Sequence, residues 1–311
     1  MNMLHKLLVI FFIVIMPTSI LAKEAIVPLE VQQITPNIYA LVGEMTQRSP
    51  NNLGNNATFG VIVTKQGVVL IDSGGSEKGA AQIHQTIKSI TNKPVVMVIN
   101  SGGQDHRWLG NHYFKQLGAK IISSEAAVKD QRARTNDQLS MLENLIGKDN
   151  FRGTQPVYAD QTFKQALDLE VGKVTLQLRH AGHAHTPGDS YIWLPQSKVV
   201  FTGDIVYVER MLGVGSVSNS ASWLKVFEAM AAHKPKHVIP GHGHGTDLVT
   251  ANRDTAEYLR MLRNSVKQLI EQGGGLDAVS KVDQSKFSYL KVYKELKGRN
   301  AHQVYQELEW E

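Results

Sequence analysis

The sequence contains no cysteine among its 311 residues. This absence excludes disulfide bonds, thiol nucleophiles and thiolate ligands for zinc. The fold must therefore be stabilised by its hydrophobic core, and any metal ion must be bound by His, Asp, Glu or Gln side chains.

The sequence also lacks a segment of concentrated positive charge. The formal net charge of +5 is spread along the chain, and the contents of 42% hydrophobic and 20% charged residues are ordinary for a globular protein. We therefore expect a small molecule, and no nucleic acid, as the binding partner. The length favours one large α/β unit or a domain with an appendage.

The apolar segment at the N-terminus is too short to cross a membrane. Its ten residues, Leu7 to Met16, follow Lys6 and end at Pro17, whereas a spanning helix needs roughly 20 apolar residues. This layout is typical of a secretory signal peptide over residues 1–22, cleaved after Ala22. We therefore expect a periplasmic or secreted protein with no stable membrane anchor after cleavage.

The rest of the chain alternates short apolar strands with helices. Ser76 is the expected N-cap of a helix over residues 77–90. Further helices are predicted over 108–117, 125–147 and 221–232, and residues 250–311 are predicted to be helical around a hinge at 273–275. Strands are predicted over residues 38–42, 59–63, 68–71, 95–99, 120–122, 167–171, 174–179, 190–193, 199–201 and 238–239. Two β-rich halves that each end in helices predict an α/β fold of stacked sheets with outer helices.

Three turns place metal-ligand side chains directly after short β-branched runs. They carry His185 before Pro187 and Gly188, Asp204 after Gly203, and His242 after Gly241. Each residue alone is explained equally well by a structural role. A buried carboxylate at a strand end needs a cation, however, and together the three turns predict a metal site. Imidazole and carboxylate ligands without thiolate suit zinc, with iron and manganese also compatible.

The order of these segments resembles the metallo-β-lactamase superfamily over roughly residues 30–250, through Thr202-Gly203-Asp204 and Pro240-Gly241-His242-Gly243. The resemblance implies an αββα sandwich of two mixed β-sheets flanked by helices, with metal ions at the edge between the sheets. It also implies that His185 ligates a first metal, Asp204 bridges two metals and His242 ligates the second. The tail from Gly298 to Glu309 resembles, more weakly, exported members found beside quinoprotein and sulfur-oxidation systems.

The expected domains are the signal peptide over residues 1–22, a metallo-β-lactamase-like domain over 23–250, and a helical extension over 251–311 packed on it.

The sequence departs from the family at one turn, where His-x-His-x-Asp-His is expected and Ser101 to His106 stands instead. One register keeps Asp105 and His106 as ligands of the second metal and replaces the first-metal histidines by Ser101 and Gly103. We prefer it because it retains both side chains in their chemical roles.

The other register keeps Gly110-Asn111 aligned with the family. It puts Gly102 and Gln104 at the histidine positions, and His106 and Arg107 at the Asp and His positions.

The preferred register predicts one complete zinc site. Its ligands are Asp105, His106, Asp204 and His242, while the first site keeps only His185 and the bridging Asp204. Gln104 adds at most a weak amide oxygen ligand. We therefore predict one tightly bound zinc ion and leave a second open, and we expect Asp105 to orient the attacking water and to take its proton.

The predicted function is that of a metal-dependent hydrolase. A metal-activated water would attack an ester, lactone, thioester or amide, with a β-lactam among the candidates, because the fold does not choose the substrate. The alternative is a non-catalytic accessory protein whose degenerate site binds a metal or a ligand. The oligomeric state is left open.

Overall fold

A computed structural model describes residues 25–311 of the chain. The predicted signal peptide, residues 1–22, lies outside the described residues. Within residues 25–311, every helix is too short or too polar to cross a membrane.

The first sheet has seven strands in sequence order, antiparallel from β1 to β4 and parallel from β4 to β7. They are β1 (Glu30–Thr35), β2 (Ile38–Val42), β3 (Thr58–Val63), β4 (Val68–Ile71), β5 (Val95–Asn100), β6 (Lys120–Ser124) and β7 (Gln161–Phe163).

The second sheet has five strands in the order β12-β11-β10-β9-β8, in which only β11 and β12 are parallel. They are β8 (Ala166–Val171), β9 (Val174–Arg179), β10 (Tyr191–Leu194), β11 (Val199–Phe201) and β12 (His237–Ile239).

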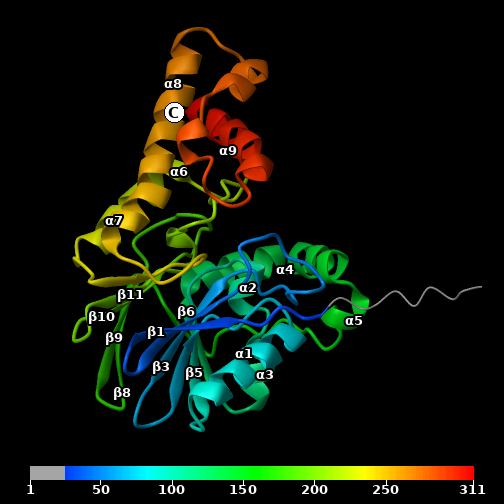
Figure 1. The fold of residues 1–311 in the computed structure, drawn as a ribbon, viewed down its shortest axis with the longest axis vertical. Helices are drawn as coiled ribbons and strands as arrows, with labels where there is room; N and C mark the ends of the chain where they lie inside the picture. The colour runs from blue at the N-terminus through cyan, green and yellow to red at the C-terminus, as the bar shows by residue number, and fades with distance from the viewer. Residues whose placement is uncertain (1–24) are drawn as a thin grey trace, which may run out of the picture.

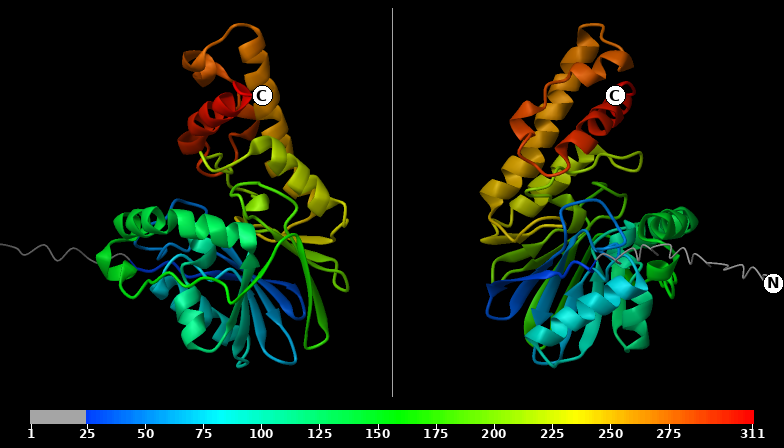
Figure 2. Two further views of the ribbon diagram at one scale, coloured as in Figure 1. Left: turned by 180° about the vertical axis from the view of Figure 1, so that it is seen from behind. Right: turned by 45° about the vertical axis from the view of Figure 1, so that its right-hand side comes forward.

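The alternation of side chains along the strands sets the layers. On β4, Val69 and Ile71 enter the core between the sheets, and Leu70 packs against α1 (Glu77–Ile90). On β11, Phe201 faces the same inner core, and Val200 packs on the outer side with α6 (Ser220–Ala231). Figures 1 and 2 show the sheets with helices outside them. The predicted αββα sandwich is confirmed.

The helices of the first half cover the outer face of the first sheet (Figure 1). Besides α1 they are α2 (Asp105–Trp108), α3 (Asn111–Gln116), α4 (Glu125–Ile146) and α5 (Lys148–Phe151). The single helix predicted over residues 108–117 is corrected to α2 and α3. The break falls at Gly110, whose N–H donates to the carbonyl of Gly74 and where a β-carbon would overlap the carbonyl of Ser73.

The C-terminal residues form a helical extension that rises above the sheets (Figure 1). Its segments are α7 (Leu248–Ala251), the π-helical η2 (Asn252–Glu257), α8 (Tyr258–Glu271), the 3₁₀ turns η3 (Leu276–Lys281) and η4 (Ser285–Phe287), and α9 (Tyr293–Leu308). The prediction of helix throughout is corrected between α8 and α9. Both helices share one hydrophobic core with α6, and the domain boundaries at residues 22 and 250 stay predictions.

Candidate metal centre

Two parallel strands bring Asp204 and His242 to one edge of the second sheet. Phe201, the last residue of β11, lies opposite Ile239, the last residue of β12. Asp204 follows in the 3₁₀ turn η1 (Gly203–Ile205), and His242 follows β12 by three residues. Both side chains therefore leave the same edge.

The first sheet is tied to this edge by direct hydrogen bonds. The N–H of Thr58 donates to the carbonyl of Gly241 at 2.8 Å, and the hydroxyl of Thr58 donates to the carbonyl of Gly243 at 2.6 Å. On the other side, the N–H of Ser190 donates to the carbonyl of Ser101 at 2.7 Å. These contacts place α2, which follows Ser101, beside Asp204 and His242.

His106, Asp204 and His242 form the candidate centre. All three are buried, and one potential ligand atom from each lies within 4.8 Å of the others. His106 Nε2 is 3.4 Å from Asp204 Oδ2, and His242 Nε2 is 3.2 Å from Asp204 Oδ1. His106 Nε2 is buried and has no hydrogen-bond partner.

The tautomer of His242 points its lone pair at Asp204. His242 Nδ1 lies 2.8 Å from the carbonyl oxygen of Asn56, which only accepts, so Nδ1 carries the proton. Burial holds the pKa of His242 well below its usual value, so the ring is neutral at neutral pH. Its Nε2 lone pair then faces a carboxylate, an arrangement that a metal ion between the two would satisfy.

Arg107 forms a buried ion pair with Asp204. Its guanidinium is fully buried and donates to Asp204 through Nε at 3.1 Å and Nη2 at 2.7 Å, and to Asp72 Oδ2 at 3.0 Å. The two remaining N–H groups donate to the carbonyls of Thr58 and Gly241. Burial would raise the pKa of Asp204, but Arg107 and His106 hold it well below its usual value. The burial of Asp204 therefore does not by itself require a metal.

The free positions on Asp204 fit one metal ion. Oδ1 accepts from Arg107 and, at 2.9 Å, from the hydroxyl of Tyr207, which fills both of its lone pairs. Oδ2 accepts only from Arg107 Nε and keeps one lone pair on the side of His106. One carboxylate position and two imidazole nitrogens make three ligands, the number typical of a catalytic zinc site.

A model of the metallo-β-lactamase superfamily matches residues 54–242, more than half of the chain. The chain belongs to the metallo-β-lactamase superfamily. It is 29% identical over 222 residues to a metallo-β-lactamase type 2 of Elizabethkingia meningoseptica, covering 70% of this chain and 80% of that protein. The solved structure of a metallo-β-lactamase from Pontibacter korlensis superposes with a TM-score of 0.60 at 20% identity, over 75% of this chain and 99% of that one.

The similarity of another solved structure extends further along the chain. The stereoselective inverting sec-alkylsulfatase Pisa1 from Pseudomonas sp. superposes with a TM-score of 0.67 at 17% identity, over 89% of this chain and 50% of that one. Residues 1–250 are about four fifths of the chain, so this match includes part of the C-terminal extension. At these identities the two superpositions show the fold alone.

Among the expected ligands of this superfamily, Asp105 lies outside the cluster. Its Oδ1 contacts Arg48 and accepts from the N–H of His106 at 2.8 Å and from Gln104 Nε2 at 3.2 Å. Burial would raise the pKa of Asp105, but Arg48 and His106 keep it well below its usual value. His106 and Arg107 both reach Asp204, as in the second register. Asp105 Oδ2 is buried and has no hydrogen-bond partner. The roles of Asp105 and Gln104 as ligands, and of Asp105 as a base, stay predictions.

Near residues 101–103, where the first-metal histidines are expected, other side chains lie against the backbone. Ser101 Oγ donates to Asp72 Oδ2 at 2.8 Å. A β-carbon on Gly102 would overlap Asp189 Oδ1, and one on Gly103 would overlap Asp130 Oδ2. His185 lies at the cavity wall with Nδ1 on the carbonyl of Gly213 at 2.9 Å, and burial lowers its pKa to about 4. Among the histidines that the family resemblance implies for the first metal, His185 is the one present in this sequence.

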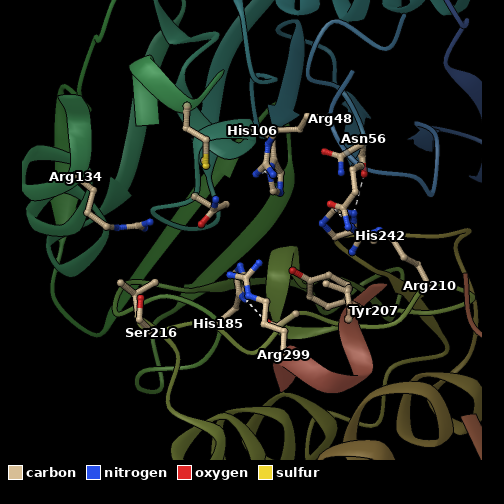
Figure 3. A pocket seen from close by; sticks show the side chains of 17 residues that line it. Arg48, Asn56, His106, Arg134, His185, Tyr207, Arg210, Ser216, His242 and Arg299 are labelled. Atoms are coloured by element: carbon tan, nitrogen blue, oxygen red, sulfur yellow. Dashed lines mark hydrogen bonds between the residues drawn. The ribbon is translucent and has the colours of Figure 1, made fainter. Parts of the chain in front are cut away.

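The candidate centre opens into a cavity of about 260 Å³ (Figure 3). Its wall includes His106, His185, His242 and Tyr207, together with four arginines to which the sequence assigned no role at the site: Arg48, Arg134, Arg210 and Arg299. Arg299 comes from α9, far along the chain, so no motif spacing signals its presence. Arg107 had a signal, because the second register places it at a ligand position.

Proposed function

We propose that this chain is an exported hydrolase that binds one zinc ion through His106, Asp204 and His242. The observation that carries the proposal is the buried pair of imidazole nitrogens around Asp204: His106 Nε2 has no partner, and His242 Nε2 presents a lone pair. Export rests on the apolar segment over residues 7–16, and the periplasm is the proposed compartment.

The surrounding residues hold the ligands in place. Zinc, when bound, supplies a Lewis acid that lowers the pKa of water and polarises an acyl oxygen. The carbonyl of Asn56 fixes the tautomer of His242, and the Tyr207 ring stacks on the His242 ring with centroids 4.5 Å apart. Arg107 fixes the carboxylate of Asp204 through two parallel bonds. These contacts orient Asp204 and His242, and the ring of His106 is held at Nδ1, which lies 2.7 Å from Arg48 Nη2 and 3.1 Å from Asp105 Oδ1.

The cavity would bind a small substrate beside these ligands. His185 is neutral at neutral pH and donates through Nδ1 to Gly213, so its Nε2 is free to accept a hydrogen bond from a substrate. With one metal, the symmetric stabilisation of attacking and leaving oxygens is missing, which disfavours phosphodiesters. We propose an ester, lactone, thioester or amide. The names of the similar proteins add a β-lactam and a secondary alkyl sulfate to the substrates worth testing.

The second candidate function is binding without turnover. It is favoured by the Arg107–Asp204 pair, which already neutralises the carboxylate, and by Gly102 and Gly103, where a β-carbon would overlap a carboxylate. Under this alternative the cavity would hold a metal or a small ligand, and the chain would act as an accessory protein.

Zinc content and turnover of the mature protein separate the two functions. We expect about one zinc per chain and hydrolysis of at least one substrate in a panel of nitrocefin, a thiolactone, a nitrophenyl ester and a secondary alkyl sulfate. Zinc affinity should fall by about 100-fold or more in His106→Ala and His242→Ala, because each removes a ligand. Zinc binding without turnover of any substrate would favour the accessory protein, and the absence of zinc binding would overturn the proposal.

Two further variants serve as matched controls for the ligand set. His185→Ala should keep zinc affinity within about threefold, and Asp105→Asn should lower it by no more than about 10-fold, as for a residue that orients a ligand. A loss of zinc affinity in Asp105→Asn as large as in His106→Ala would restore the first register, in which both residues are ligands.

A further inference from the structure

The cavity beside the candidate centre carries an excess of positive charge. Four arginines line it, and none of its lining residues is an Asp or a Glu. Figure 3 shows Arg48, Arg134, Arg210 and Arg299 entering the cavity from different sides. The charge therefore surrounds the space that a substrate would occupy.

Two of the arginines are neutralised from behind. Arg48 forms an ion pair with Asp105, and Arg134 forms one with Asp130, four residues earlier on α4. The carboxylates of both pairs are buried behind the lining. These two arginines add little net charge to the cavity.

Arg210 is buried without an anionic partner. Its residue is 5% exposed, and its guanidinium donates to the carbonyls of Met45 and Met211 and to Gln47 Oε1, at 3.2 to 3.3 Å. No carboxylate within residues 25–311 lies within ion-pair distance of it. Burial lowers its pKa. A buried guanidinium that has only neutral acceptors is costly, and an anion in the cavity would compensate it.

Arg299 brings a second uncompensated charge from the C-terminal extension. It has no hydrogen bond or ion pair to another residue in the described part of the chain, and Figure 3 shows its side chain reaching into the cavity beside His185. The next residue, Asn300, anchors α9 by accepting from the N–H of Val214 at 2.8 Å and donating to the carbonyl of Leu212 at 2.7 Å. The position of Arg299 is therefore built into the packing of α9.

We propose that Arg210 and Arg299 select a substrate that carries an oxyanion group, such as a carboxylate, a sulfate or a phosphate. The inference rests on the proposed function and adds that the substrate carries a negative charge. Guanidinium groups match the planar, multidentate geometry of such anions. The extension thus completes the substrate site, because one of the two charges comes from α9 and lies outside residues 54–242, which match the family model.

Direct binding of small oxyanions to the mature zinc-loaded protein tests the proposal without turnover. Sulfate, phosphate and acetate are titrated by calorimetry at constant ionic strength into wild type, Arg299→Gln, Arg299→Lys and Lys294→Gln. Lys294 lies on the same helix, is exposed and does not line the cavity. We expect saturable binding of at least one anion, weakened about 10-fold in Arg299→Gln, partly restored in Arg299→Lys and unchanged in Lys294→Gln. No saturable binding, or equal binding in all four proteins, overturns the proposal.

Arg210→Gln provides a second, independent variant, with its circular dichroism and unfolding midpoint measured first because the side chain is buried. If it folds, its anion affinity should also fall by about 10-fold. If it does not fold, Arg299→Gln alone decides.

A pair of nitrophenyl esters, one with a free carboxylate and one with that carboxylate methylated, separates this inference from the proposed function. Anion binding without turnover of either ester, or of any substrate in the panel above, overturns the function and leaves the anion site. Turnover with the same KM for both esters, unchanged in Arg299→Gln, overturns the inference and leaves the hydrolase.

Discussion

The two halves of the site differ in the side chains that they keep and in how those side chains are bonded. Around His106, Asp204 and His242, the candidate ligand atoms are buried, and those of Asp204 and His242 are oriented and keep free lone pairs. Around His185, the expected neighbours are a serine and glycines, and carboxylates of Asp72, Asp130 and Asp189 occupy the space next to them. One half keeps the donors of a metal site, and in the other a β-carbon on Gly102 or Gly103 would overlap a carboxylate.

The comparison shows how the negative charge of each buried carboxylate is neutralised. Asp204 and Asp72 share one guanidinium, and Asp105 and Asp130 each have an arginine. Asp189 has no cation, and burial together with the charge of Asp204 raises its pKa to about 8. In this fold, the charge of a buried aspartate is therefore neutralised by an arginine or by protonation, and its burial alone does not indicate a metal ion.

The largest expected effect is the removal of Arg107. Arg107→Met leaves Asp72 and Asp204 buried without their cation, so the free energy of unfolding should fall by about 3–5 kcal/mol. Urea denaturation of the mature protein measures it. Arg152→Met is the matched control, because the Arg152–Asp149 pair is 80% exposed on both sides and should contribute about 0.5 kcal/mol or less. Equal losses in the two variants would mean that a metal, and not Arg107, compensates Asp204.

The next effect is the pH dependence of stability that Asp189 contributes. Its folded pKa of about 8 lies above the ordinary value of 3.8, so the folded state holds its proton more tightly than the unfolded state does. Its contribution is thus fully present below pH 3.8 and is lost as the pH rises toward 8. Between pH 5 and 8 this amounts to a loss of stability on the order of 3 kcal/mol.

Asp189→Asn isolates that contribution. The variant cannot ionise at this position, so the decline of its unfolding free energy between pH 5 and 8 should be flatter than in wild type by about the same amount. Asp149→Asn, at an exposed position, should follow the wild-type curve. A wild-type curve that already rises over this range in parallel with Asp189→Asn would show that Asp189 is ionised in the folded protein.

Local patterns were sufficient to predict the elements with a hydrophobic face. Helix α1 was predicted with its bounds and with its cap, where Ser76 Oγ accepts from the N–H of Gly79. Strands β9 and β11 were also predicted with their bounds. Strand β1 was missed because it is an edge strand whose six residues are all exposed or half-buried, so no alternation marks it.

The sequence predicted site residues only where one turn carries the signal. Asp204 and His242 follow short apolar runs and were found, and His106 was found by its neighbour Asp105. Arg107 and Asp204 are 97 residues apart in the sequence, and Arg299 reaches the cavity from α9 of the C-terminal extension. Such contacts depend on tertiary packing, so the second register marked the position of Arg107 but did not reveal its partner.

The smallest expected effect tests whether the first-metal half is truly closed. A β-carbon on Gly103 would overlap the carboxylate of Asp130, which is held by Arg134, so Gly103→Ala should destabilise the fold by about 1–3 kcal/mol. Gly213 lies at the wall of the same cavity, and a β-carbon there meets no atom within 4 Å. Gly213→Ala removes the same backbone freedom from the unfolded chain and should be neutral or stabilising by up to about 1 kcal/mol. Thermal and urea unfolding of both variants measure the difference. If Gly103→Ala is as stable as Gly213→Ala, the turn has room for the missing side chain, and the contrast between the two halves reflects the residues present and not the space around them.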